Sequence, residues 1–542
     1  MDKRTLIAIV LSLALVMLYQ YLFVKPVAVQ KPADQAKQET AVSATTTPGA
    51  TPEATSGPET PILQRSLFKR EEAVVPGKDI TVDTPLYTAV FSTRGGALRS
   101  MKLKNYKTET GPSGVPVEMV SLIPEMSYPL TTGFSDSTVE IDPNVLFEAD
   151  REKLTLAREE GPETLTFSWT YPGEITLEKR YTFHADSYLF DLDLTVRNLS
   201  DGVIRQTGLL SWNHYVDPNR EEDSYGFEGP VYYYKDDVDT LAVKKIKSPQ
   251  TIGPDISWGG YESKYFIAAM ISQQPPLTSL VLSKEGDDRV SVDLEGPRNV
   301  IPPQQAGSFR YALYVGPKDH TILKSVGAGL ENAIDFGSWI KWLALPLLKA
   351  LKFIYGFVHN YGLAIIILTL FVKILFWPLG NMSYRSMKGM QKLQPKINEL
   401  REKYKDDKAR LNQEVMSLYK IHKVNPMSGC LPIFIQIPVF FGLYKALLYA
   451  IELRHAPFVF WISDLSAKDP YYITPILMGA TMFLQQKMTP SSGSDMQQKM
   501  MMWMPIVFTF LFLSFPSGLV LYWLFNNILS IGQQYYVNRQ KS

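Results

Sequence analysis

The sequence predicts a polytopic α-helical membrane protein with six spans. It also predicts a large all-β sandwich domain outside the cytoplasm and a helical hairpin in the cytoplasm. Three observations support this fold class: long apolar stretches in both terminal parts of the chain, a central region of short alternating runs, and one strongly basic connection. The mean hydropathy of -0.06 hides this division, because it averages parts of opposite character. At 542 residues the chain is also too long for one compact core.

Charge and cysteine content exclude several classes of protein. Lys and Arg number 55 and Asp and Glu 54, so the net charge is +1 and there is no overall basic field. We therefore expect no specific DNA binding. The one cysteine, Cys430, excludes an internal disulfide and a thiolate cluster, and the six histidines show no metal-ligand spacing. We expect no metal site and no cofactor.

The N-terminal residues 1–24 predict a membrane anchor. Residues 5–24 carry no charge over twenty positions, which matches the roughly 30 Å of a bilayer core. Lys3 and Arg4 precede this stretch, so the positive-inside rule places the N-terminus in the cytoplasm. Residues 25–61 are dominated by Pro, Ala, Thr and Glu and predict a disordered linker on the outer side.

Residues 62–335 predict the β-sandwich domain. Hydrophobic and polar residues alternate along Phe190–Arg197, which is the pattern of a half-buried strand. Similar runs occur at Thr164–Tyr171 and Phe309–Val315, and turn residues fill Asn198–Gly202. Because the anchor begins in the cytoplasm, we expect this domain on the outer side of the membrane.

The last third of the chain predicts an interfacial helix and five more spans. Lysines spaced among Trp, Leu and Phe in 336–355 predict an amphipathic helix, kinked at Pro346. The spans are expected at 356–377, 429–450, 471–486, 500–515 and 517–537. The connection 379–428 holds eleven Lys and Arg against five Asp and Glu, which places it in the cytoplasm. Residues 538–542 would form a short cytoplasmic tail.

Within that basic connection, residues 384–423 predict a pair of helices. Hydrophobic residues follow steps of three and four in both arms, at Met390, Leu393, Ile397, Leu400 and Tyr404 and at Leu411, Val415 and Leu418. The sequence KDDK at 405–408 would form the turn, and Pro395 should bend the first arm. The alternative is a solvated linker with accidental periodicity.

The polar residues of the predicted spans suggest a candidate site. The spans contain no Asp or Glu, which argues against a proton-coupled pump, and the chain has no ATP-binding P-loop. Lys373 is an intramembrane cation that needs water or polar partners, which makes it a functional candidate. Alternatively, it lies five residues before Pro378 and could reach the interface by snorkelling.

The other candidates are also open to two interpretations. Asn and Gln side chains in the spans could line a site or could hold helices together. Tyr522 and Trp523 in the last span could form a contact face or could pack as ordinary interface aromatics.

Four stretches of the C-terminal part carry motifs of one known family. They are Lys373–Pro378 leading into LQPKINELREKYKDDK, then VNPMSGCLPIFIQIPVF, then APFVFWISDLSAKDPYYITPILMGATMFLQQKM, and FPSGLVLYW. Together they resemble the YidC/Oxa1/Alb3 family of membrane protein insertases over roughly 356–537. The anchor, linker and β domain match the Gram-negative architecture with a large periplasmic domain. The resemblance implies a five-helix insertase core in the bacterial inner membrane, with a hydrophilic groove and no catalytic residue.

The resemblance also assigns roles to particular residues. The essential cation of the groove falls on Lys373, with Thr369 one turn before it. A well-known member has Arg at this position, so Lys keeps the charge but not the bidentate geometry. Gln436, Asn526 and Asn527 fall at groove-lining positions, and Tyr522 and Trp523 fall where the last helix contacts substrate.

The implied function is to insert nascent inner-membrane proteins and help them fold, alone or with the Sec translocon, so the protein should not be an enzyme. Implied partners are nascent membrane proteins, membrane lipids, the Sec translocon with its accessory subunits and, weakly through the hairpin, the ribosome. The sequence also allows two alternatives. A solute transporter would need a midplane site and usually internal repeats. A membrane-tethered periplasmic carbohydrate-binding protein would place its function in residues 62–335.

Overall fold

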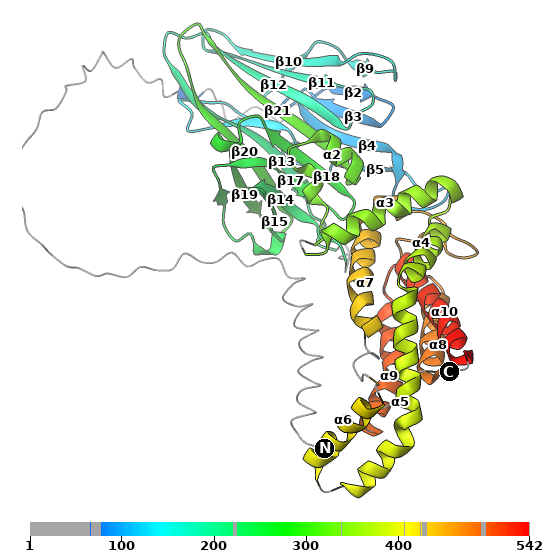
Figure 1. The fold of residues 1–542 in the computed structure, drawn as a ribbon. Helices are drawn as coiled ribbons and strands as arrows, with labels where there is room; N and C mark the ends of the chain where they lie inside the picture. Colours follow the sequence, from blue (N-terminus) through cyan, green and yellow to red (C-terminus); the bar gives the residue numbers. More distant parts are fainter. Residues whose placement is uncertain are drawn as a thin grey trace, which may run out of the picture. The chain divides into compact units, whose positions relative to one another are not determined.

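A computed structural model describes residues 65–66, 77–219, 225–337, 339–405, 407–422, 424, 431–488 and 495–540 (Figure 1). They form two compact units, which we describe separately. The β unit covers Val117–Gly316, Val326–Leu330 and the described residues up to Tyr106. The helical unit covers Lys107–Pro116, Pro317–Ser325 and the described residues from Glu331 onward. The predicted anchor 1–24 and most of the predicted linker lie outside the described residues.

The strands follow one another through most of the first 317 residues. In chain order they are β1 (Arg65–Ser66), β2 (Asp79–Asp83), β3 (Tyr87–Ser92), β4 (Ala97–Lys107), β5 (Pro116–Glu118), β6 (Thr131–Ser135), β7 (Val139–Glu140), β8 (Glu148–Ala149), β9 (Lys153–Thr155), β10 (Glu163–Tyr171), β11 (Ile175–Phe183), β12 (Leu189–Asn198), β13 (Ile204–Tyr215), β14 (Gly229–Tyr234), β15 (Asp237–Thr240), β16 (Gln250–Ile252), β17 (Ile256–Glu262), β18 (Phe266–Ser272), β19 (Ser279–Glu285), β20 (Arg289–Ile301) and β21 (Ala306–Pro317).

These strands form one long sheet and three smaller ones (Figure 1). The long sheet has nine strands in the order β15-β14-β17-β18-β21-β12-β11-β10-β8. Two sheets have five strands each, β16-β19-β20-β13-β6 and β5-β4-β3-β2-β9, and β1 pairs with β7. Neighbours in the long sheet run antiparallel wherever their register is defined, for example Leu192 opposite Tyr181 and Tyr311.

The core of the β unit lies between sheets. Along β12, Phe190, Leu192, Leu194 and Val196 are buried and the residues between them are half-buried, as their alternation predicts. The β3 ring of Phe91 lies with its centroid 4.7 Å from that of Tyr181 on β11. Aromatic pairs at this separation add to the stabilisation from burial. The prediction that this region is mostly β-sheet is confirmed.

The remaining elements are helices. They are η1 (Val243–Lys245), η2 (Pro275–Leu277), α2 (His320–Val326), η3 (Leu330–Ala333), α3 (Lys341–Val358), α4 (Tyr361–Leu375), α5 (Trp377–Lys403), α6 (Lys408–Ile421), α7 (Leu431–Tyr449), η5 (Ile451–Leu453), α8 (Ile473–Met488), α9 (Asp495–Phe512) and α10 (Ser517–Arg539). Within the helical unit, the α5–α6 turn lies at the opposite end from α3 (Figure 1).

The break between α3 and α4 differs from the predicted boundary. The sequence predicts an interfacial helix ending at 355 and a span beginning at 356, whereas α3 continues to Val358. His359 adopts a left-handed conformation with φ 51°, and the Asn360 side chain accepts a hydrogen bond from the Leu363 amide at 3.0 Å. Asn is a preferred N-cap residue, so α4 begins directly after it.

A second break separates α4 from α5. The two helices meet at 64° around Phe376, and Pro378 occupies the first turn of α5, where its missing N–H costs little. Among the described residues, no single helix has both the length and the hydrophobicity expected of a membrane span, and α4 with α5 meets both conditions only as a bent pair. The six spans therefore stay a prediction.

The predicted pair of helices is present in α5 and α6. The Asp407 side chain accepts a hydrogen bond from the Arg410 amide at 3.0 Å and caps α6, which begins at Lys408, so the connection after Lys403 overlaps the predicted KDDK turn. The first arm belongs to a longer helix than predicted, since α5 begins at Trp377 and passes through Pro395 without ending.

The base of this hairpin is packed against the last helix. Val537 of α10 joins a hydrophobic cluster with residues of both arms, namely Tyr384, Met387, Met390, Leu393, Ile397 and Tyr419. Lys388 Nζ donates to the carbonyl oxygens of Asn538 at 3.1 Å and Gln540 at 2.9 Å. A lysine at a helix C-terminus satisfies carbonyls that have no partner in the helix. The hairpin is therefore fixed to α10 at its base.

Lys352 ties α3 to two other segments of the helical unit. Its Nζ lies 3.3 Å from Asp319 Oδ2, next to α2, and 2.6 Å from Glu452 Oε1 in η5. Burial would raise the pKa of Asp319, but Lys352 and the amides of Ile322 and Thr321 hold this pKa below its usual value. Burial opposes the charge of Lys352, yet the carboxylates of Glu452 and Asp319 raise its pKa.

We expect Lys352→Met to lower the free energy of unfolding by about 2 kcal/mol, because two partly buried carboxylates would face each other without a cation. Lys349→Met, at an exposed position of the same helix, should change it by less than about 0.5 kcal/mol. Thermal unfolding of the purified protein in detergent, followed by circular dichroism, measures both. Equal effects of the two substitutions would contradict this arrangement.

The effect of Lys352→Met should also depend on pH. The pKa of Asp319 is lower in the folded than in the unfolded protein, so its contribution is complete above the ordinary value of 3.8. The difference between wild type and variant should therefore shrink as the pH falls through the lower, folded-state pKa.

Candidate functional site

The candidate site is built around Lys373, in the last turn of α4. Its Nζ donates to Ser530 Oγ of α10 at 2.7 Å, and Ser530 Oγ donates in turn to the Asn526 carbonyl at 2.7 Å. Ser530 is buried and Lys373 is half-buried. An ammonium group that leaves water needs an acceptor, and Ser530 supplies one. Lys373 is thus bonded to a hydroxyl of α10, and that hydroxyl is bonded to the backbone of the same helix at Asn526.

The polar residues of α10 continue along the helix as a stripe. Asn526, Ser530 and Gln533 follow steps of four and three, and Asn527 and Gln534 are seven residues apart, so both sets recur at helical spacing. All five are buried. We call these five residues the α10 polar stripe.

The α10 polar stripe binds three neighbouring helices. Asn527 Nδ2 donates to Thr481 Oγ1 of α8 at 3.4 Å, and Gln534 Nε2 donates to the Met488 carbonyl of α8 at 2.7 Å. Gln533 Nε2 donates to the carbonyl of Trp377 and to Asn381 Oδ1, both in α5 and both at 3.0 Å. With the bond from Lys373, the stripe therefore links α10 to α4, α5 and α8.

Thr369 is placed one turn before Lys373 but points its hydroxyl at its own helix. Thr369 Oγ1 donates to the Ile365 carbonyl at 2.6 Å, and the side chain is buried. This i to i−4 bond satisfies the hydroxyl locally, as is common for Thr within helices.

Gln436, Tyr522 and Trp523 lie where α7 and α9 meet α10. The Tyr522 hydroxyl is hydrogen-bonded to Gln436 of α7, and Tyr522 is only 2% exposed. The Trp523 ring packs edge-on against Phe440 of α7 at a centroid distance of 4.7 Å and lies 5.2 Å from Phe512 of α9. In this structure both predicted substrate-contacting aromatics are therefore engaged in helix packing.

Sequence reasoning missed several residues of this arrangement: Asn381, Thr481, Ser530, Gln533 and Gln534. The signal for three of them was present in the last helix, where polar residues recur at helical spacing from Asn526 onward. Asn381 and Thr481 carried no such signal, because only their contacts with α10 distinguish them.

The surface next to Lys373 is apolar. Within α4, four large side chains near it are between 43% and 64% exposed, namely Leu370, Phe371, Ile374 and Leu375. Lys373 thus lies at the edge between a buried polar stripe and an exposed apolar surface. Such a site can hold an anionic group and leave an adjoining apolar segment in contact with hydrocarbon.

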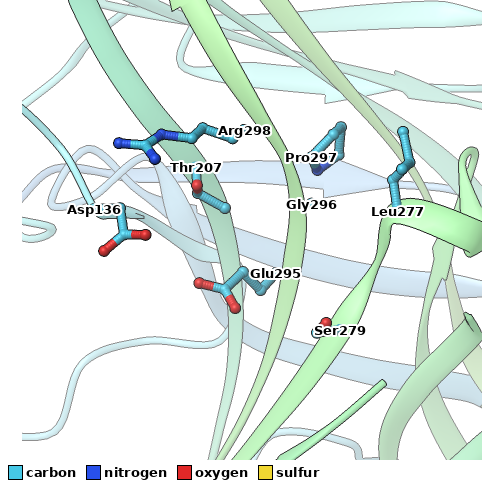
Figure 2. A pocket seen from close by; sticks show the side chains of 8 residues that line it. All are labelled: Asp136, Thr207, Leu277, Ser279, Glu295, Gly296, Pro297 and Arg298. Atoms are coloured by element: carbon cyan, nitrogen blue, oxygen red, sulfur yellow. The ribbon is translucent and has the colours of Figure 1, made fainter. Parts of the chain in front are cut away.

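A separate pocket of about 380 Å³ lies in the β unit (Figure 2). It forms at a bulge in which Thr207 pairs with Arg298 and Leu209 with Glu295, so that Gly296 and Pro297 are set apart from the ladder. Figure 2 labels the eight lining residues, among them two carboxylates and Arg298 but no aromatic ring on which a sugar could stack. The pocket therefore gives the carbohydrate-binding alternative no support.

Two family models match the chain. The 60Kd inner membrane protein family matches residues 353–542, and the YidC periplasmic domain family matches residues 79–350. The membrane protein insertase YidC of Syntrophus aciditrophicus (strain SB) is 58% identical over 550 residues and covers 100% of both chains. The membrane protein insertase YidC of Geotalea uraniireducens (strain Rf4) is 43% identical over 542 residues and covers 99% of both chains.

Two solved structures are similar in part. A structure described as an active YidC insertase with its first transmembrane domain resolved has a TM-score of 0.38 and 20% identity, and the match covers 86% of this chain and 95% of that chain. A galactose mutarotase related enzyme from Lactobacillus acidophilus has a TM-score of 0.29 and 14% identity, and the match covers 44% and 97%.

These matches define the class of the protein as an inner-membrane protein with a periplasmic domain. More particularly, the chain belongs to the YidC family of membrane protein insertases. The names of the relatives describe insertases rather than enzymes, which agrees with the expectation that the chain is not an enzyme.

We expect Ser530→Ala to lower the free energy of unfolding by about 1 kcal/mol, because Lys373 would lose its acceptor. In a Lys373→Met background the same substitution should cost less, since the bond is already absent. Ser463→Ala, at an exposed position between α7 and α8, serves as a control and should have little effect. Thermal unfolding of the four variants and wild type in detergent tests the pair. If Ser530→Ala lowers the free energy of unfolding equally in both backgrounds, the bond between Lys373 and Ser530 does not contribute to stability.

Proposed function

We propose that the chain inserts nascent membrane proteins into the bacterial inner membrane and helps them fold, alone or with the Sec translocon. The observation that carries this proposal is Lys373, a cation held on the α10 polar stripe at the edge of an exposed apolar surface. A nascent membrane segment has an apolar stretch and a polar flank, and this site offers a partner to each. The membership of the YidC family supports the same function.

The energetic problem is the passage of the polar flank. Moving one acidic side chain to the bilayer centre costs about 3 kcal/mol on insertion scales. A cation and polar side chains partway across the membrane lower this barrier. Partition of the apolar segment into lipid supplies the net free energy, and the membrane potential adds about 2.3 kcal/mol per charge per 100 mV for an acidic flank moving outward.

In this proposal each site residue has a role. Lys373 holds the flank by charge, and Thr369, Gln436, Asn526 and Asn527 line the hydrophilic groove. Tyr522 and Trp523 contact the apolar segment. In the structure Tyr522 is bonded to Gln436 of α7, and Trp523 packs on Phe440 of α7 and Phe512 of α9, so a substrate helix would replace these contacts when it reaches both aromatics.

The proposal includes a topology. Six spans would place both termini in the cytoplasm and the domain 62–335 in the periplasm, with the helix 336–355 in the interface and the core at 356–537. The positive-inside rule supports this orientation, because the connection 379–428 carries eleven basic against five acidic residues.

The hairpin 384–423 would be the cytoplasmic contact for the ribosome or the emerging chain, and the Sec translocon with its accessory subunits and the membrane lipids would be further partners. Exposed basic side chains on both arms support this, among them Lys396 on α5, Lys405 in the turn and Lys420 on α6. Contacts of such exposed charges weaken with salt, since the Debye length is about 10 Å at 0.1 M.

Substitutions at Lys373 test the central role of charge. We expect Lys373→Arg to retain insertion of a substrate with an acidic flank, Lys373→Ala to reduce it, and Lys373→Glu to reduce it more than about tenfold, because a like charge repels the flank. Protease protection of the substrate in proteoliposomes measures insertion, and a neutral-flank substrate is the control. Normal insertion of the acidic-flank substrate by a folded Lys373→Glu protein would refute the electrostatic role.

Charge reversal tests the hairpin. Changing Lys396, Lys405 and Lys420 together to Glu should weaken association with ribosome-bound nascent chains at low salt, and the difference from wild type should diminish as salt is added. Reversing three exposed lysines of the β unit, Lys102, Lys153 and Lys247, is the matched control. Cosedimentation with stalled ribosomes measures the association. If both triple variants behave alike at low ionic strength, the hairpin does not make this contact.

A further inference from the structure

The connection between α7 and α8 carries an exposed apolar tip. Phe460 is 92% exposed, more than any other large hydrophobic side chain that the structure describes, and its neighbour Val459 is 42% exposed. The ring of Trp461 stacks on that of Phe460 at a centroid distance of 5.9 Å. We call Val459, Phe460 and Trp461 the 459–461 tip. Val459 and Phe460 are exposed and Trp461 is half-buried, and adjacent exposed apolar side chains are typical of a contact surface.

The 459–461 tip is held in place by its own loop. The Phe458 amide donates to the Ile462 carbonyl at 2.9 Å, and the Ile462 amide donates to the Val459 carbonyl at 3.3 Å. Phe460 has a φ of 55°, in the left-handed region that bulky residues rarely adopt. Backbone strain of this kind persists only where the surrounding structure enforces it. The fold therefore projects Phe460 outward at an energetic cost.

The carboxylates of the same loop are satisfied internally. Asp469 is only 1% exposed and accepts hydrogen bonds from the Trp461 indole at 3.0 Å and from both the amide and the hydroxyl of Thr474. Asp464 accepts from the amide and hydroxyl of Ser466. The two carboxylates, which would disfavour an apolar surface, are thus hydrogen-bonded within the loop. Lys468, in contrast, is exposed. Aromatic rings with a cation nearby suit lipid headgroups.

The loop also joins several helix ends at one level of the helical unit. Asn360 Nδ2, at the start of α4, donates to the Phe458 carbonyl at 3.1 Å. The amides of Ser517 and Gly518, at the start of α10, donate to the carbonyls of Ala467 and Leu465. The loop itself follows α7 and precedes α8. In Figure 1, the start of α4 lies at the end of the unit away from the α5–α6 turn.

Apolar surface continues from this level along the helices. The first turns of α4 and α8 expose Leu363, Ile476 and Leu477, each between 43% and 57%, and the tyrosines at 471 and 472 are exposed before α8. Tyr and Trp side chains are enriched at the boundary between bilayer and water. The 459–461 tip therefore lies at the end of a surface suited to lipid.

We propose that the 459–461 tip inserts into the interfacial layer of the bilayer, at the end of the helical unit opposite the hairpin. The occupant of this surface is a lipid bilayer, and the orientation proposed above makes it the outer leaflet. The inference rests on the membrane location of the family and not on the insertion mechanism. The lipid contact of the tip and the proposed insertion mechanism can therefore fail independently.

A fluorescent label at the tip tests the proposal. Cys430→Ser removes the one cysteine of the sequence, and Phe460→Cys in that background accepts a nitrobenzoxadiazole label. The whole protein is reconstituted in vesicles of phosphatidylethanolamine and phosphatidylglycerol. We expect lipids with a doxyl group near the headgroup to quench the label at least about twofold more than lipids with a deep doxyl group, and aqueous iodide to quench it weakly.

Leu277→Cys in the same background is the control, because Leu277 is 60% exposed in η2 of the β unit. Its label should respond to iodide and not to doxyl lipids. A label at 460 that behaves like the one at 277 overturns the proposal, and so does a label shielded from iodide and from all doxyl lipids, which would show a protein partner. If Phe460→Cys does not fold, Val459→Cys reports on the same tip. Combining the labelled variant with Lys373→Glu should leave the quenching unchanged even where insertion fails.

Discussion

A polar side chain removed from water must find a partner, and the helical unit meets this constraint mainly on α10. The α10 polar stripe supplies the Lys373 acceptor and bonds to α5 and α8 through Gln533, Gln534 and Asn527. The residues that make the last helix polar are thus the ones that hold its neighbours. Because Lys373 bonds to this stripe, the position of the candidate site depends on how α10 packs.

The hairpin is connected to the same helix. Val537 packs in the hydrophobic cluster at its base, and the carbonyls of Asn538 and Gln540 accept hydrogen bonds from Lys388, so the base is fixed to the end of α10. A displacement of α10 would consequently move both the hairpin base and the acceptor of Lys373. The positions of the hairpin, proposed to receive a nascent chain, and of Lys373, proposed to bind its flank, therefore both depend on the packing of α10.

The sequence predicted the features that depend on local pattern. Alternation identified β12, steps of three and four identified the hairpin, and a lone charge in an apolar run identified Lys373. Features that depend on a partner far along the chain were missed. Ser530 is an ordinary residue of a helix until Lys373 is placed 2.7 Å from it, and His359 ends α3 only because it adopts a left-handed conformation. The bounds of the anchor and linker rest on composition alone.

The hydrogen bond of Lys373 to Ser530 affects how the proposed site would bind an acidic flank. Its partner is a neutral hydroxyl, so the charge is not cancelled and remains available to an acidic flank, whereas a carboxylate partner would compete with that flank. Hydrogen bonds between membrane helices contribute only about 0.6 kcal/mol each on average. A nascent helix that brings its own polar groups could replace the contacts of the α10 polar stripe at little net cost. In the proposed mechanism, polar rather than purely apolar packing around α10 would let helices separate and close again as a substrate passes.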